Sequence, residues 1–137
     1  MTWTEGSAGA DLVAQGLRKS SVLWLTLPTW PAPRIAWHVW HEGAAWLVHE
    51  GAEQTLPGLD RARTAQVWVR ATDGRLLARW PARVESVGPD DPRWPAAAAA
   101  LNAHRQSPPD GDAQTARWAA QSHLTRLVPL TEPAEAG

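Results

Sequence analysis

The chain has 137 residues, a length that suits one domain with a single hydrophobic core. It contains no cysteine, which excludes disulfide frameworks, thiol chemistry and cysteine-based zinc sites. The net charge of −1 gives no basic footprint for nucleic acid, and no apolar run approaches the ~20 residues that a membrane-spanning helix needs.

The first elements in chain order are a tail, a helix and a strand. Residues 1–10 read as a flexible tail without the basic-then-apolar order of a signal peptide, so we expect a cytoplasmic protein. Asp11 is placed to cap a short helix over residues 11–21. The segment 21–30, SVLWLTLPTW, predicts a buried strand that the three prolines of PTWPAP bring to an end.

The segment 34–50, RIAWHVWHEGAAWLVHE, predicts a β-hairpin and holds three tryptophans and three histidines. Its strands meet at Glu42–Gly43, a hairpin turn signal. The turn sets two cross-strand pairs, Val39 with Trp46 and Trp37 with Val48.

Because side chains alternate along a strand, the predicted hairpin has two faces. One is uniformly apolar and is expected to be buried: Ile35, Trp37, Val39, Trp46 and Val48. The other is mixed: Ala36, His38, Trp40, Ala45, Leu47 and His49. Three interpretations stay open for the mixed face. It packs on a helix or a second subunit, it stacks against a planar aromatic ligand, or two of its histidines hold a metal ion with a third ligand from elsewhere.

The rest of the chain continues with short elements. We expect a loop or helical crossover over 51–64, a strand over 65–71, a turn at 72–74 and a long strand over 75–87 with a kink at Pro81. A helix over 88–106 should follow, capped by Asp90 or Asp91 and with Pro92 in its first turn. The last elements expected are a short helix over 114–121, a strand over 123–130 and a disordered tail over 132–137. Such antiparallel runs favour a small barrel over a doubly wound sheet.

The order of these elements resembles a known family. The resemblance rests on the order of these segments: the helix, SVLWLTLPTW, the proline-rich turn, the hairpin block WHVWHEGAAW, the basic crossover LDRAR, AQVWVRA, a long strand, a helix and HLTRLVPL. The chain resembles the pyridoxamine 5'-phosphate oxidase-like, FMN-binding split β-barrel family, including its deazaflavin (coenzyme F-420) branch. The resemblance spans residues 11–131. It implies a mainly β fold with flanking helices, a six-stranded antiparallel split β-barrel, and a homodimer with a flavin in a groove at the subunit interface.

The same resemblance implies where a phosphate would be held. In many members the loop after the third strand reads like Ser-x-Lys-x-x-x-Leu, and its lysine binds the phosphate. Placing Leu59 on the leucine of that motif puts Thr55 at the lysine position, with Glu50 and Glu53 just before it. The chain therefore departs from the motif. The residues that remain for the phosphate are Arg34, Thr55, Arg61 and Arg63.

The ring contacts implied by the resemblance come from the mixed face of the hairpin. Trp40 and Leu47 would flank the ring, and His38 or His49 would hydrogen-bond its pyrimidine edge or a substrate. The function implied is hydride transfer between FMN or a deazaflavin and a small organic acceptor, with the redox chemistry carried by the cofactor.

An alternative of another class is a cofactor-free split-barrel homodimer that acts as a small-ligand-binding or interaction module. The missing lysine and the nearby carboxylates favour it. The sequence shows no Ser–His–Asp arrangement, P-loop or GxGxxG, and no metal site is expected.

Overall fold

A computed structural model of the chain describes residues 22–51, 53–70, 76–103 and 112–130. The predicted tails at 1–10 and 132–137, the helix over 11–21 and the turn at 72–74 lie outside these ranges. No helix in the described ranges has the length and apolar character to cross a membrane.

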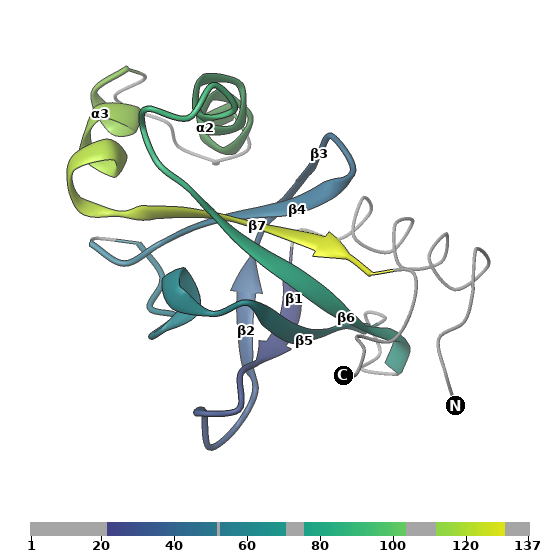
Figure 1. The fold of residues 1–137 in the computed structure, drawn as a ribbon. Coiled ribbons are helices and arrows are strands. Elements are labelled where there is room, and N and C mark those ends of the chain that lie inside the picture. Colours follow the sequence, from purple (N-terminus) through teal and green to yellow (C-terminus); the bar gives the residue numbers. More distant parts are fainter. Residues whose placement is uncertain (1–21, 52, 71–75, 104–111, 131–137) are drawn as a thin grey trace.

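The fold is mainly β with two flanking helices, as predicted (Figure 1). The strands are β1 (Val22–Thr26), β2 (Arg34–Trp37), β3 (Val39–His41), β4 (Ala44–His49), β5 (Thr64–Arg70), β6 (Leu76–Val87) and β7 (His123–Pro129). A 3-10 helix, η1 (Leu59–Arg61), follows β4, and two α-helices, α2 (Trp94–Ala103) and α3 (Asp112–Gln121), lie between β6 and β7.

The strands form one antiparallel sheet in the order β2-β1-β5-β6-β7-β4-β3. Its two edge strands, β2 and β3, are consecutive in the chain and are separated only by His38. The edges of the sheet therefore meet at that residue, and the sheet curls into a split barrel. We expected six strands and find seven in the described ranges, because the strand predicted over 34–41 changes its neighbour at His38.

The hairpin turn forms as predicted. Glu42 has φ 51° and Gly43 has φ 76°, so both central residues adopt the left-handed conformation that a type I′ turn requires. The pairing of Val39 with Trp46 is confirmed.

The second predicted pair, Trp37 with Val48, is wrong. Trp37 pairs with Val22 on β1 instead, and the side chain of Gln54 stands between Trp37 and Val48. Its Nε2 donates to the carbonyls of Trp37 at 3.0 Å and Val48 at 3.2 Å, and its Oε1 accepts the Trp37 N–H at 3.0 Å. A side-chain amide thus replaces the peptide group of a neighbouring strand at the split of the barrel.

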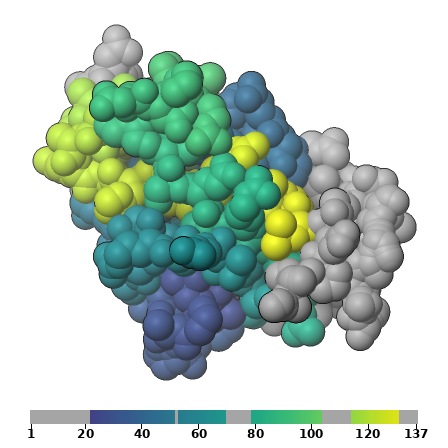
Figure 2. All heavy atoms as spheres, viewed as in Figure 1, coloured from purple at the N-terminus to yellow at the C-terminus, as the bar shows by residue number. Residues whose placement is uncertain are grey.

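Apolar residues are buried in two separate clusters. The first fills the barrel interior and includes Leu23, Leu25, Leu47, Val67 and Trp80. The second lies between the sheet and the helices and includes Val39, Trp46, Leu101, Trp118 and Leu124. The helices therefore cover one end of the molecule, and the β1–β2 segment forms the opposite end (Figure 2).

The helix predicted over 88–106 begins at Trp94, later than expected, so Pro95 rather than Pro92 lies in its first turn. Of the two expected cap residues, Asp91 lies three residues before Trp94, and its Oδ1 accepts the backbone N–H of Arg93 at 2.8 Å in the turn that precedes the helix. Hydrogen bonds from the Arg93 guanidinium and backbone lower the pKa of Asp91 to about 2.

The long strand β6 continues through Pro81 as one strand of 12 residues. The irregularity in its pairing with β5 lies elsewhere, where the register shifts between Val69 and Arg70.

Candidate functional site

The mixed face of the hairpin forms part of the barrel interior. His38, Leu47 and His49 are each 0% exposed, and Trp40 is partly buried against the interior cluster. Of the ring contacts that the resemblance implies, only Trp40 keeps an exposed part in the single chain. The sequence pattern shows that the face is mixed, but it does not show that the sheet closes over it.

The face predicted to be uniformly buried is buried along only part of its length. Val39, Trp46 and Val48 lie under the helices, and half-buried Trp37 packs against the same cluster, whereas Ile35 is 53% exposed. The expectation for Ile35 is therefore wrong. Its strand leaves the helix-covered side of the sheet at His38, where its pairing changes from β4 to β1.

His49 lies at the end of β4 with both ring nitrogens engaged. Its Nε2 is 2.8 Å from the Thr125 hydroxyl, and its Nδ1 is 3.2 Å from Oε1 of Glu50. Burial lowers the pKa of His49, and the neighbouring Glu50 carboxylate opposes that shift.

The two carboxylates near the expected phosphate position serve the protein itself. Glu50 Oε1 accepts the backbone N–H of Leu56 at 2.6 Å. Glu53 Oε2 accepts the indole N–H of Trp118 on α3 at 3.0 Å. These acceptor oxygens are therefore engaged by N–H groups of the chain. Thr55, at the position of the family's lysine, is exposed.

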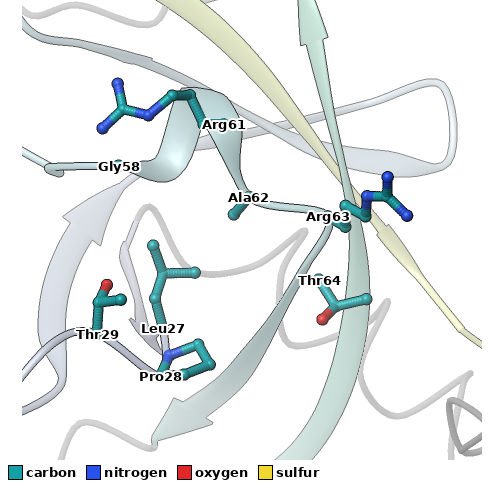
Figure 3. Close-up of a pocket in the computed structure, with 8 residues that line it drawn as sticks. All are labelled: Leu27, Pro28, Thr29, Gly58, Arg61, Ala62, Arg63 and Thr64. Atoms are coloured by element: carbon teal, nitrogen blue, oxygen red, sulfur yellow. The ribbon is translucent and has the colours of Figure 1, made fainter. Parts of the chain in front are cut away.

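A groove of about 360 Å³ separates the end of β1 from η1 (Figure 3). Its lining residues are Leu27, Pro28, Thr29, Gly58, Arg61, Ala62, Arg63 and Thr64. The groove brings together two of the predicted phosphate residues, Arg61 and Arg63. Sequence reasoning missed the threonines and the β1 end, because only the fold places them beside the arginines.

The guanidinium groups of Arg61 and Arg63 point outward, in different directions, from the groove (Figure 3). The Arg61 side chain is 79% exposed and lies 3.7 Å from Asp60 Oδ2. Long, exposed arginine side chains reorient readily, so both can turn toward an anion that enters the groove.

Arg34, the remaining predicted phosphate residue, belongs to a neighbouring contact. Its guanidinium lies 5.3 Å from the ring centroid of Trp30. The Trp30 indole N–H donates to the carbonyl of Pro57 at 2.7 Å, which ties the β1–β2 connection to the segment that precedes η1. Arg34 therefore stacks near the groove without lining it.

An apolar, partly exposed surface covers the outer side of β2, β1 and β5. Register places Trp24 between Ile35 on β2 and Trp68 on β5, and Val22 opposite Trp37. Val22 is 40% exposed, and the three tryptophans are half-buried. We call these five residues the open face. Trp24 and Trp68 were missed as site candidates, although their alternation with buried neighbours is readable in the sequence.

The open face runs into the groove along β5. Thr64, Gln66 and Trp68 share the outer side of that strand, and Thr64 lines the groove. Four residues of strand span about 13 Å, which is within reach of one extended ligand. Across the described ranges, no group of three histidine or acidic side chains is arranged to hold a metal ion.

No protein-family model and no curated protein sequence matches the chain. Two solved structures share its fold. HutZ, the heme storage protein from Vibrio cholerae, has a TM-score of 0.58 and 15% identity over 86% of this chain and 90% of its own. A general stress protein 26 from Jannaschia sp. CCS1 has a TM-score of 0.58 and 15% identity over 87% of this chain and 72% of its own. At this identity the likeness concerns the fold alone.

Proposed function

We propose that this split barrel is a homodimer that binds a planar aromatic cofactor carrying a phosphate, FMN or a deazaflavin, and that it transfers hydride to a small organic acceptor in the cytoplasm. The observation that carries the proposal is the continuity of the groove with the open face. Arginines that suit an anion and indoles that suit an aromatic ring adjoin each other along β5.

The groove supports the anionic part of the ligand. Arg61 and Arg63 bring two guanidinium groups, each able to bind a phosphate through paired N–H donors. Thr29 and Thr64 add hydroxyl groups to the lining. Glu50 does not line the groove, and its Oε1 accepts hydrogen bonds from the His49 ring and the Leu56 N–H.

The open face supports the ring. Trp24 and Trp68 pair across β1 and β5, and such neighbouring indoles offer a flat apolar surface for stacking. Gln66, exposed between Trp68 and Thr64, can hydrogen-bond polar atoms at a ring edge. We base the ring site on this face rather than on the hairpin residues His38, Leu47 and His49, which are fully buried.

A second copy of the chain is the proposed cover of the ring site. Exposed Ile35 and half-buried tryptophans beside arginines have the composition of a protein interface. When bound, a flavin or deazaflavin supplies the hydride chemistry. The residues of this chain anchor the phosphate, orient the ring and, in the dimer, exclude water from it.

The second candidate is the cofactor-free interaction module. It is favoured by one observation: exposed Thr55 stands where the family has its phosphate-binding lysine. In that case the open face would still support the dimer, but the groove would bind no flavin. Heme, which HutZ is named for storing, is also planar with an anionic edge and belongs among the ligands to be tested.

A titration decides between these functions. FMN, coenzyme F-420 and hemin are added separately to the purified protein, and tryptophan quenching is followed. We expect saturable quenching by FMN or F-420 at micromolar concentrations. The double substitution Arg61→Ala with Arg63→Ala should weaken that binding about tenfold or more, since a hydrogen bond to a charged group contributes ~1.5–3 kcal/mol.

The matched control is Arg117→Ala, which removes an exposed arginine from α3 and should leave the affinity unchanged. Equal affinity in the double variant would contradict the phosphate assignment. If neither FMN nor F-420 quenches the fluorescence, the cofactor proposal is contradicted and the interaction module is favoured. Saturation by hemin alone would instead identify heme as the ligand.

A further inference from the structure

One wall of the groove is formed by Gly58 and the η1 residues that follow it, and the side chain of Glu50 helps to fix the segment from Glu53 to Gly58 that leads into this wall. Glu50 Oε1 accepts the Leu56 N–H, and the Leu56 carbonyl in turn accepts the Leu59 N–H at the start of η1. Leu56 is 1% exposed in the barrel interior, and Gly58 lines the groove. The position of this wall therefore depends on the Glu50 carboxylate.

The backbone at Glu50 is strained and needs such bonds. Glu50 has φ 68° and Gly51 has φ 66°, so two successive residues adopt the left-handed conformation, which is unfavourable for glutamate. The Glu50 N–H donates to the Gln54 carbonyl at 2.7 Å, and the Glu50 carbonyl accepts the Ser122 hydroxyl at 2.9 Å. The Glu50 carbonyl also accepts the Glu53 N–H at 3.1 Å, so loss of the side-chain bonds would leave these three backbone hydrogen bonds of Glu50 to hold the turn.

His49 is joined to the same carboxylate oxygen. Because a carboxylate only accepts, His49 Nδ1 carries the proton donated to Glu50, and in the neutral ring Nε2 accepts the Thr125 hydroxyl. One oxygen of Glu50 thus receives both the imidazole N–H and the Leu56 N–H. A second proton on the ring would turn Nε2 into a donor, force the Thr125 hydroxyl to turn, and place a charge where the side chain is 0% exposed.

The groups that face His49 from the packed elements are few. Glu50 is the next residue in the chain, and His123 on β7 has its ring centroid 5.5 Å from that of His49. Asp60 on η1 lies 3.9 Å from His123 Nε2. Burial lowers the pKa of His49, the carboxylates of Glu50 and Asp60 oppose the shift, and a charge on His123 adds to it.

We propose that His49 and Glu50 form a proton-sensitive latch that holds the wall of the groove in place at neutral pH and releases it in weakly acidic solution. Release exposes the imidazole to water, which stabilises its charged form. The opening constant of the wall should then rise up to about tenfold for each pH unit of acidification below the pKa of the exposed ring. A groove with a displaced wall would hold its anion less tightly; this consequence alone rests on the proposed function.

Amide hydrogen exchange tests the latch without any ligand. The protection of the Leu56 amide is measured by NMR at pH 7.5, 6.5 and 5.5, after correction for the intrinsic exchange rate. In the wild-type chain it should fall severalfold, up to about tenfold, mainly between pH 6.5 and 5.5, because the ordinary pKa of the exposed ring is 6.5. In His49→Gln the fall should be absent, and in His123→Gln it should persist. The Val67 amide, in the centre of the sheet, reports global unfolding and should stay better protected than Leu56 at each pH.

No change with pH in the wild-type chain, or the same change in His49→Gln, would overturn the latch. If His49→Gln does not fold, the ring ¹⁵N shifts of His49 in the wild-type chain decide the matter. Their midpoint should coincide with the loss of Leu56 protection, and a separate midpoint would overturn the proposal. Because no flavin is present, failure of the proposed function would leave this result unaffected.

Discussion

The two halves of the sheet differ in what covers their outer side. Around β3, β4 and β7, the helices α2 and α3 bury Val39 and Trp46, which are 9% and 2% exposed. Around β2, β1 and β5, the open face leaves Ile35 53% exposed. The chain passes from the open half of the sheet to the helix-covered half at His38, between β2 and β3. The helices α2 and α3 cover one side, whereas we propose that a ligand and a second copy cover the other.

The largest expected effect is a difference in unfolding free energy between alanine variants of two tryptophans, one on each half of the sheet. Trp46→Ala opens a cavity under the helices and removes a hydrogen bond from the indole to the His41 carbonyl at 3.0 Å, so it should cost ~3–5 kcal/mol of unfolding free energy. Trp24→Ala on the open face should cost only ~1–2 kcal/mol, because less of its side chain is buried. Urea unfolding at protein concentrations below dimer association measures both. Equal losses would contradict the difference between the halves.

Association should depend on the open half. Ile35→Glu places a charge in the proposed interface and should weaken the dimer by about 3 kcal/mol or more, while the monomer keeps its stability. Sedimentation equilibrium measures the change, with Ala96→Glu on the exposed side of α2 as the matched control. A monomeric wild-type chain at high concentration, or a dimer unaffected by Ile35→Glu, would count against the interface.

Gln54 joins the two halves of the sheet at the split of the barrel, between Trp37 and Val48; we call this contact the seam. Gln54→Ala removes three hydrogen bonds that join Trp37 to Val48, and we expect a loss of about 2–3 kcal/mol of unfolding free energy. Gln66→Ala, an exposed glutamine on β5, should change stability by less than ~0.5 kcal/mol. If the two variants unfold alike, the amide does not hold the seam.

The smallest effect concerns pH. The pKa of His49 is lower in the folded chain than in the unfolded one, where it is the ordinary 6.5, so the unfolded state binds the proton first. Folding stability is therefore full above pH 6.5 and falls as pH drops from 6.5 toward the folded value, by ~1.4 kcal/mol for each pKa unit of difference. Urea unfolding at pH 7.5 and 5.5 measures the loss, and the His49→Gln chain should lose less. An equal loss in that variant would assign it to other groups.

Local signals predicted much of the fold. The left-handed turn at Glu42–Gly43 and the pairing of Val39 with Trp46 follow from residues that are neighbours in sequence. The predicted pairing of Trp37 with Val48 was wrong for a non-local reason, because the side chain of Gln54, 17 residues away, takes the place of the expected partner strand. Closure of the barrel, which buries His38 and exposes Ile35, likewise depends on strands far apart in the chain.

The candidate site was predicted in part. Arg61 and Arg63 were found because the resemblance directs attention to the segment after β4, and they do line one groove. Thr29 and Thr64 could not be found, since only the fold brings the end of β1 beside η1. The pairing of Trp24 with Trp68 is also set by sheet order, although both positions lie in strands whose alternation was readable.

Fluorine NMR of the chain labelled with 5-fluorotryptophan tests the central claim most directly, because it resolves the indoles of the two halves. The resonances are assigned by Trp24→Phe, Trp68→Phe and Trp46→Phe variants, and FMN or coenzyme F-420 is then added. We predict shifts at Trp24 and Trp68 and none at Trp46. Shifts confined to Trp46 or to the barrel-interior Trp80, or no shift at any indole, would contradict a ligand site on the open face.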